Sequence, residues 1–360
     1  MDGGIIADMD LPTPLAWLVD EASASAAPDR FLAELGHRLQ ASGLPLAAGS
    51  LTLAVPHPII ARRTWLWRAE TGAVIEALGF TDGPLSQIGR DALDGFSPVE
   101  VDVIGVTADS PVLAWAGTRL FNTDESVRLR QIARFAAAPL SALAARAALA
   151  ALLEAYLGRR SAARVQAGAL RRGTGETIRA VLLYADLRGF TALSETTEPA
   201  AVIAALDAWF DRIAGAVHAF GGEVLKFIGD GMLAIFPVSN APAAACEAAL
   251  RAVVAARAGM AHLDAMRQTQ DLPPLPFGAA LHLGEILWGN IGAADRLDFT
   301  AIGPAVNLVS RLEGLCRPLG QSVLISGAVA AGIAAPLVPL GEHALRGIAA
   351  LCTVFTLPDA

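Results

Sequence analysis

Several kinds of residue are scarce in this sequence of 360 residues, and each scarcity excludes a class of protein. The three cysteines, Cys246, Cys316 and Cys352, lie far apart with no CxxC spacing, which excludes a disulfide scaffold and a zinc ribbon. The six histidines are scattered, so the sequence indicates no histidine-based metal cluster. Basic residues are fewer than acidic ones, 27 against 35, and the net charge of -8 disfavours binding to nucleic acid through a basic surface.

Long uninterrupted apolar runs are also lacking, although 54% of the residues are hydrophobic. The most apolar window, residues 133–153, contains Arg134, Pro139 and Arg146 and owes its hydropathy mostly to alanine, so we expect no membrane span. The acidic N-terminal segment has neither the basic start nor the apolar stretch of a signal peptide. Together with the few cysteines, these features predict a cytoplasmic protein.

Lysine is the scarcest charged residue, since Lys226 is the only lysine among the 27 basic residues. Lysine carries a compact point charge, whereas the head group of arginine is a planar fork. One lysine can survive a codon bias toward arginine by chance. Alternatively, position 226 requires the compact ammonium group, and the surrounding residues have to decide between these interpretations.

Residues 1–122 predict a small α+β domain. Helix is expected over residues 15–44, where apolar side chains recur at helical spacing, and strands over 50–55, 64–68, 99–107 and 111–119. Turn-forming residues, such as those at 81–84, separate the strands. No group of residues in this part has the pattern of a catalytic site, so we expect the chemistry further along the chain.

A long helix is predicted over residues 123–157. Residues 122–125 form an N-cap cluster, and apolar residues recur every three or four positions from Leu129 to Leu157, with a kink expected at Pro139. Such a stripe packs either against its own domain or along the same helix of a second copy, and both alternatives stay open. Residues 158–177 are polar and punctuated by glycine, which predicts a connector.

From residue 178 to residue 360 the pattern alternates between strands and helices. Strands are expected over residues 179–186, 223–228, 232–236, 275–282, 285–289, 322–325 and 352–357, and helices over 199–220, 241–266 and 304–316. This order predicts an α+β domain that has antiparallel strands in its sheet and helices on one face.

Two aspartates of this domain are candidate metal ligands. Asp186 ends an apolar strand, and Asp230 lies in a tight Gly-Asp-Gly turn between two strands. Taken singly, such residues are more often a solvated strand end and a simple hairpin turn. If the hairpin brings them together, two carboxylates with no basic residue between them require cations, as in two-Mg²⁺ phosphoryl transfer.

A third segment carries Asn307 and Arg311 on a predicted helix that begins at Pro304. The two residues are four positions apart, so they share one face of the helix. The rest of the helix is apolar, and a polar pair in such surroundings costs more free energy than a pair on an ordinary surface. This arrangement favours a functional role for both side chains.

The segments 184–191, 226–231 and 300–311 together resemble the signature segments of the class III nucleotide cyclases, the adenylate and guanylate cyclase family. The resemblance extends from residue 178 to about residue 357. It implies a ferredoxin-like sheet related to the polymerase palm, and a homodimer with sites at the interface. It further implies ATP as substrate, 3′,5′-cyclic AMP and pyrophosphate as products, and two Mg²⁺ ions per site, which Mn²⁺ can replace.

The resemblance also implies the roles of the polar residues. Asp186 and Asp230 match the two metal-binding aspartates of the family. Asn307 matches the asparagine that orients the ribose, and Arg311 matches the arginine that stabilises the transition state. One copy is expected to supply the two aspartates to a site, and the other copy the asparagine and the arginine.

Contacts to the triphosphate are implied for one turn and two arginines. The residues concerned are Leu187, Gly189, Phe190, Thr191, Arg296 and Arg346. At Arg346 the sequence has Arg-Gly where other members have Lys-Gly, a change that keeps the positive charge.

Two further residues fall on the positions that read the purine. Lys226 stands where adenylate cyclases have lysine and guanylate cyclases have glutamate, and its ammonium group suits an acceptor such as adenine N1. Thr300 marks the subgroup that includes the bicarbonate-responsive cyclases, so bicarbonate is a candidate effector. The alternatives are a guanylate or mixed-specificity cyclase and a non-catalytic nucleotide-binding regulator.

The upstream part has a resemblance of its own. Its order of helix, sheet and long exit helix resembles a GAF-type sensor domain that is joined to a cyclase by a signalling helix. The resemblance implies that an unidentified small molecule or protein acts on residues 1–122 as a signal.

Overall fold

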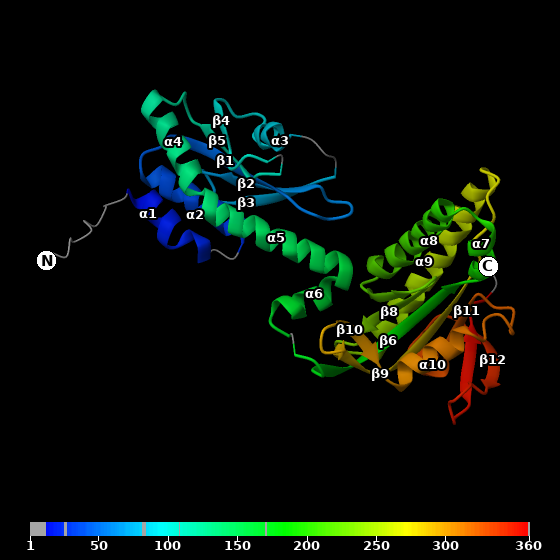
Figure 1. Cartoon of the computed structure of the whole chain (residues 1–360). Coiled ribbons are helices and arrows are strands. Elements are labelled where there is room, and N and C mark those ends of the chain that lie inside the picture. Colours follow the sequence, from blue (N-terminus) through cyan, green and yellow to red (C-terminus); the bar gives the residue numbers. More distant parts are fainter. Residues whose placement is uncertain (1–11, 25–26, 81–83, 108, 170, 359–360) are drawn as a thin grey trace. The chain divides into compact units, whose positions relative to one another are not determined.

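The computed structural model describes residues 12–24, 27–80, 84–107, 109–169 and 171–358 (Figure 1). The chain divides into two compact units, Met1–Tyr156 and Leu157–Ala360, and each is described by itself. Most of the turn expected at residues 81–84 and the acidic N-terminal segment lie outside the described residues.

The N-terminal unit is built on an antiparallel five-stranded sheet in the order β3-β2-β1-β5-β4. The strands are β1 (Leu46–Ala54), β2 (Arg62–Arg68), β3 (Val74–Gly79), β4 (Val99–Val103) and β5 (Val112–Gly117). The helices are α1 (Thr13–Asp20), a 3₁₀ turn (Ala22–Ala24), α2 (Pro28–Ala41) and α3 (Leu85–Asp91). Sequence reasoning missed β3 and α3 and merged α1 and α2 into one helix, and β4 ends four residues earlier than expected.

The core of this unit lies between the sheet and α2. Leu32, Leu35 and Leu39 form the apolar stripe expected from the sequence, and all three are buried. The rings of Trp67 on β2 and Trp115 on β5 meet edge to face with centroids 6.3 Å apart. These contacts hold the helix on one face of the sheet.

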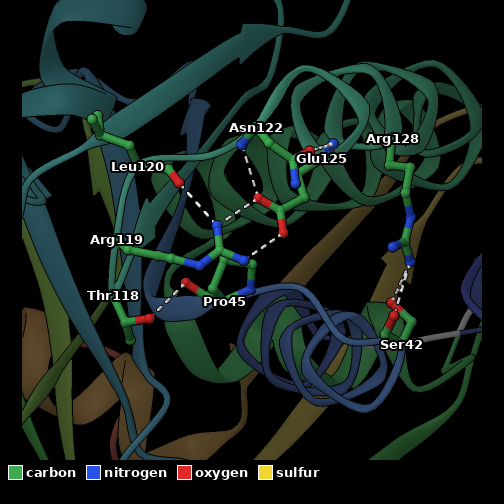
Figure 2. A network of polar contacts seen from close by, with 8 residues as sticks. All are labelled: Ser42, Pro45, Thr118, Arg119, Leu120, Asn122, Glu125 and Arg128. Atoms are coloured by element: carbon green, nitrogen blue, oxygen red, sulfur yellow. Dashed lines mark hydrogen bonds and ion pairs between the residues drawn. The ribbon is translucent and has the colours of Figure 1, made fainter.

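A polar network fixes the start of α4 (Thr123–Phe135), as Figure 2 shows. The Asn122 side chain accepts from the backbone N–H of Glu125, and the Glu125 carboxylate accepts from the backbone N–H of Asn122, both at 2.9 Å. Arg119 donates to both carboxylate oxygens of Glu125, at 2.9 and 2.8 Å. Arg128, one turn further along, donates to the backbone and hydroxyl oxygens of Ser42. The N-cap expected from the sequence is therefore present.

The expected long helix is interrupted at Ala136, between α4 and α5 (Ala137–Leu157). Pro139 explains the break, because its ring clashes with the carbonyl four residues earlier, at Phe135. The stripe from Leu129 to Leu143 packs into the core of the N-terminal unit. The C-terminal half of α5 extends beyond that core, and its exposed residues include Leu149, Leu152 and Tyr156.

Helix α5 is long and apolar enough to cross a membrane, and no other described helix passes that test. Only 17% of its apolar window is buried. It nevertheless carries Arg146 and Glu154, and its first half packs on a protein core. The absence of a membrane span therefore stays a prediction.

The predicted connector contains a helix, α6 (Arg159–Gln166), which packs against the C-terminal unit. The backbone N–H of Arg160 donates to Glu223, and the guanidinium groups of Arg160 and Arg164 lie 5.7 and 5.8 Å from the ring centroid of Trp288. Residues 159–166 therefore belong structurally to the C-terminal unit, a contact that the polar composition of this stretch did not predict.

The C-terminal unit contains one mixed sheet. Its strands are β6 (Gly175–Leu187), β7 (Glu223–Ile228), β8 (Gly231–Pro237), β9 (Phe277–Gly292), β10 (Leu297–Ile302), β11 (Val323–Ser326), β12 (Val338–His343) and β13 (Cys352–Thr356). The helices are α7 (Phe190–Thr196), α8 (Pro199–Ala219), α9 (Pro242–Gln268), α10 (Pro304–Glu313) and α11 (Gly327–Ala330). The two strands expected over residues 275–289 are one continuous strand, β9, and β10 and β12 were not predicted.

The centre of this sheet has the order β9-β6-β8-β7, and all three pairings are antiparallel. Along the chain these strands alternate with α8 and α9 in a β-α-β-β-α-β pattern, which is the ferredoxin-like arrangement expected for the domain.

Helices cover both faces of the sheet, so the expectation of helices on one face was wrong. Alternate residues of β6 point to opposite sides: Val181 and Leu183 pack with α8 and α9, whereas Ala180 and Leu182 pack with α10. Strand β6 is apolar on both faces because each face is buried.

Candidate functional site

Asp186 and Asp230 lie together at one end of the sheet. Asp186 is the penultimate residue of β6, and its register partner on β8 is Gly231, the residue that follows Asp230. The side chains of the two aspartates are hydrogen-bonded to each other. The sequence placed Asp186 at the end of one strand and Asp230 in the turn between two others, and the β6–β8 pairing brings them into contact.

The environment of the pair disfavours two negative charges. Burial, followed by the hydrogen bond and the charge of Asp230, raises the pKa of Asp186 to about 7. Two touching carboxyl groups are both ionised only when a cation neutralises them, so this donor set fits a divalent metal ion. No group of three or more metal-ligating side chains occurs among the described residues, which leaves further coordination positions for water or substrate oxygens.

Neighbouring elements hold both aspartates in position. The indole N–H of Trp209, a fully buried residue of α8, donates to the backbone oxygen of Asp230 at 3.1 Å. After Asp186 the chain turns through Gly189, whose φ of 77° is one that a residue with a side chain rarely adopts. The backbone conformation of the turn therefore explains the glycine at position 189, as the sequence indicated.

The turn after β6 leads into α7. In this turn Leu187 is buried, Phe190 is half-buried, and Gly189 and Thr191 are exposed. Its backbone is therefore accessible from solvent next to the carboxyl pair, as contact with a phosphate chain would require.

Asn307 and Arg311 share the solvent-facing side of α10, whereas Val309 and Leu312 of the same helix are buried. Both polar side chains are exposed, and neither has a hydrogen bond or ion pair to any residue that the structure describes. The single chain therefore brings them together with each other but not with Asp186 and Asp230.

Lys226 lies on β7 and forms an ion pair with Asp298 on β10. Thr300, two residues after Asp298, occupies the same face of β10 by the alternation of the strand and is 8% exposed. The structure thus brings Lys226 to the strand that carries Thr300. Because Thr300 is nearly covered, Asp298 is the more accessible acceptor on this face.

The two arginines expected at the triphosphate are both exposed. Arg296 lies between β9 and β10, and Arg346 lies in the loop after β12. Neither has an ion pair with a described residue. The structure leaves both guanidinium groups free to meet an anion.

Sequence reasoning missed three polar residues near these positions: Tyr184, Asp298 and Glu313. Burial, with smaller contributions from the charges of Asp186, Glu313 and Asp230, raises the pKa of the Tyr184 phenol to about 12. Strand alternation contained a signal for two of them, because Tyr184 is two residues from Asp186 and Asp298 is two residues from Thr300. Glu313 had no such signal, since only the packing of α10 brings it near the pair.

Comparisons with known proteins show what the C-terminal part of the chain is similar to. Residues 176–350 match the family described as "Adenylate and Guanylate cyclase catalytic domain". An adenylate cyclase of Anabaena cylindrica is 32% identical over 168 residues, 46% of this chain and 32% of the relative. Adenylate cyclase 1 of Rhizobium meliloti is 34% identical over 149 residues, 41% of this chain and 22% of the relative. The chain thus matches about a third or less of the length of these two relatives.

A solved structure of a bacterial light-regulated adenylyl cyclase is similar in fold. The similarity covers 86% of this chain and 94% of that one, with a TM-score of 0.54 and 18% sequence identity. At that identity the match supports the fold and leaves the role of the N-terminal unit as a prediction.

Proposed function

We propose that residues 176–350, which match the adenylate and guanylate cyclase family, form a class III nucleotide cyclase catalytic domain, and that the chain is an adenylate cyclase that converts ATP to 3′,5′-cyclic AMP and pyrophosphate. The contact between Asp186 and Asp230 carries the proposal, because it creates a divalent-cation site at the end of β6 in a domain of this family. The adenylate cyclases of Anabaena and Rhizobium support the choice of ATP.

The carboxyl pair is the proposed site of two Mg²⁺ ions. When bound, such ions lower the pKa of a ribose hydroxyl and neutralise charge on a triphosphate. Asp186 and Asp230 would hold them through carboxylate oxygens. Backbone N–H groups of the turn Leu187–Thr191, which is exposed at Gly189 and Thr191, would bind phosphate oxygens beside them. The guanidinium groups of Arg296 and Arg346 would balance the charge of the pyrophosphate that leaves.

In the proposed reaction the 3′-hydroxyl oxygen attacks the α-phosphorus in line, and the bond to the bridging oxygen of the β-phosphate breaks. Asn307 orients the ribose through its amide, and Arg311 donates to the oxygens of the α-phosphoryl group as charge develops there. The 3′-hydroxyl gives its proton to solvent water in the same step, and pyrophosphate leaves with the electron pair of the broken bond.

The site is proposed to be shared between two copies of the chain. Within one chain Asn307 and Arg311 lie exposed on α10 and make no contact with the carboxyl pair. A homodimer would bring the two groups together, because the Asn307–Arg311 face of one copy can contact the Asp186–Asp230 pair of the other. Lys226 and Thr300 would then read the base in the site that their own Asn307 serves.

Adenine is favoured by the donor chemistry of position 226. The ammonium group of Lys226 donates only, and adenine N1 accepts, whereas guanine presents an N–H there. The ion pair with Asp298 supports this proposal, because it holds the ammonium group on the face that also carries Thr300. Asp298 would also provide an acceptor for the amino group of adenine.

The N-terminal unit is proposed to bind a regulatory signal. It contains a cavity of about 570 Å³ whose polar lining includes Arg62, Ser86, Thr107, Asp109 and Ser110. A concave site with a few polar groups is the usual form of a small-molecule site. The chemical identity of the signal and an effect of bicarbonate on the catalytic domain are separate proposals that effector titrations would test.

The decisive experiment uses the purified chain with Mg²⁺ or Mn²⁺ and either ATP or GTP, with separation of the products. We expect cyclic AMP and pyrophosphate from ATP in equal amounts. Cyclic GMP as the main product would support a guanylate cyclase instead. Binding of ATP without turnover under both metals would support a non-catalytic regulator and would overturn the proposed activity.

A further inference from the structure

Helix α10 carries a further charged residue, Glu313, whose surroundings differ from those of Asn307 and Arg311. Glu313 is the last residue of the helix, two positions after Arg311, so it lies about 200° further around the helix axis. Its side chain is half-buried, whereas Asn307 and Arg311 are exposed. The helix therefore presents one polar face to solvent and turns a carboxylate toward the sheet.

The carboxylate of Glu313 occupies a space beside Asp186. In the β6–β9 pairing the register partner of Asp186 is Gly278. A Cβ atom at Gly278 would collide with Oε1 of Glu313 and would lie 3.2 Å from its Cδ and 3.3 Å from Cβ of Cys316. Because position 278 has no side chain, the Glu313 carboxylate can lie over this strand next to the carboxyl pair.

Arg188 balances part of this negative charge. It follows Asp186 by two residues, in the turn that begins at Leu187, and donates to the backbone oxygen of Gln321. Its positive charge acts on Glu313 and on the thiol of Cys316. Among the three carboxyl groups only Glu313 is under its influence, whereas the charges that act on Asp186 are those of Asp230 and Glu313, so negative charge is in excess at the end of β6.

Glu313 is too far from the pair to be a third ligand. Among the described residues no three ligating side chains are grouped closely enough to hold one metal ion. A charge just outside the ligands still attracts a cation, and it occupies no coordination position that phosphate oxygens need. Residues of this outer kind orient the ligands and tune metal affinity.

We propose that Glu313 is a positioning residue that strengthens divalent-cation binding at Asp186 and Asp230. It supplies a negative charge beside the pair, outside the ligand positions. Since α10 also carries Asn307 and Arg311, the same contact fixes that helix relative to the carboxyl pair of its own chain. The inference rests on the metal site of the proposed function and adds a residue outside the three signature segments 184–191, 226–231 and 300–311.

The test measures the affinity of the full-length chain for Mn²⁺ alone, by electron paramagnetic resonance, with no nucleotide present. Glu313→Gln keeps the size of the side chain and removes its charge, and we expect about tenfold weaker Mn²⁺ binding. Glu313→Asp should recover part of the affinity. Glu342→Gln removes an exposed charge on β12 and serves as the matched control, with unchanged affinity.

A second variant displaces the carboxylate without removing it. Gly278→Ala puts a methyl group into the space of Glu313 Oε1, so the side chain has to move away from Asp186. We expect Mn²⁺ binding to weaken as in Glu313→Gln. In the Glu313→Gln background the same alanine should have less effect than alone, because no charge remains to be displaced.

Asp186→Asn separates this inference from the proposed function. If Asp186→Asn loses Mn²⁺ while Glu313→Gln and Gly278→Ala bind within twofold of wild type, the role of Glu313 is overturned and the metal site stands. If Asp186→Asn binds Mn²⁺ like wild type, the metal site itself is wrong and both proposals fail. Circular dichroism melting curves identify any variant whose loss of affinity follows from unfolding, and such a variant counts against the inference.

Discussion

Two carboxyl sites, one in each unit of this chain, differ in how their charge is neutralised. In the N-terminal unit Glu125 receives two hydrogen bonds from Arg119 and one from the backbone of Asn122 (Figure 2). Hydrogen bonding by Arg119, with Asn122 next, lowers the pKa of this carboxyl group to about 2. The network is complete within the unit, so it needs nothing from outside and serves to cap a helix.

The C-terminal unit has the opposite arrangement. Asp186 and Asp230 face each other with no cation of the protein between them, and Glu313 adds a third carboxyl group nearby. Asn307 and Arg311 have no partner among the described residues. Charges that a fold leaves uncompensated are typical of ligand sites, and this contrast supports the candidate site proposed in the C-terminal unit.

The largest expected effect is the loss of turnover on removal of one aspartate. Asp186→Asn or Asp230→Asn should lower kcat by at least about 10³-fold, because cation binding provides several kcal/mol of charge stabilisation. The control in the other unit is Glu34→Gln, which breaks an exposed ion pair with Arg38 and should leave kcat unchanged. Substantial Mg²⁺-supported activity in either aspartate variant would show that the carboxyl pair is not required for turnover, and the contrast between the two units would then carry no information on function.

Mixing variants tests whether the site is shared between copies. Asp186→Ala and Arg311→Ala should each be inactive, since loss of a preorganised donor such as Arg311 costs about 10²–10³ in rate. In a freely exchanging mixture half of the dimers are mixed and each has one intact site, so about a quarter of wild-type activity should return. A mixture that exchanges subunits and stays inactive would show that each site lies within one chain.

Base selection should follow Lys226. The wild type should prefer ATP to GTP by at least about two orders of magnitude in kcat/KM, because guanine N1–H would face the ammonium group of Lys226, donor against donor. Lys226→Glu should weaken ATP use sharply. Asp298→Asn keeps the lysine but removes its ion-pair partner, so its loss should be smaller. Equal use of ATP and GTP by the wild type would contradict this proposal and leave the cyclase activity untouched.

Removal of the N-terminal unit should change assembly more than chemistry. A chain of residues 157–360 keeps α6 and its contact with Glu223, and we expect it to dimerise more weakly, with activity that depends steeply on protein concentration. The reason is the apolar C-terminal half of α5, whose exposed residues would pack along a second copy. If activity depends on protein concentration in the same way with and without the N-terminal unit, the C-terminal half of α5 does not pair with a second copy and serves only its own unit.

The smallest expected effect is on the cap of α4 at acid pH. The folded pKa of Glu125, about 2, is below its ordinary value of 4.5, so its contribution to stability is present above pH 4.5 and is lost as the pH falls toward 2. Hydrogen exchange of the α4 amides should therefore be slower in wild type than in Glu125→Gln at pH 6. The difference should shrink at pH 3, whereas the exchange of β9 should not respond to this substitution.

Much of the C-terminal unit follows from local patterns. Strand β7 has the predicted bounds, and α8, α9 and β8 differ from prediction by one or two residues, because apolar periodicity and turn residues act over short distances. In the N-terminal unit the same reasoning missed β3, whose side chains are mostly exposed and which therefore has no apolar alternation. Strand β9 was divided in two because Gly284 breaks its apolar pattern, although the strand continues through it.

The sequence by itself determined which residues can do the chemistry: two acidic residues at strand ends, one lysine, and an Asn–Arg pair on one helix face. Those features are local, and spacing along a strand or helix suffices to recognise them. Only the tertiary structure decided that β6 and β8 bring the aspartates into contact, that Lys226 pairs with Asp298, and that Gly278 makes room for Glu313. Such contacts join residues tens of positions apart, and they depend on strand order and on helix packing across the sheet, which no local pattern contains.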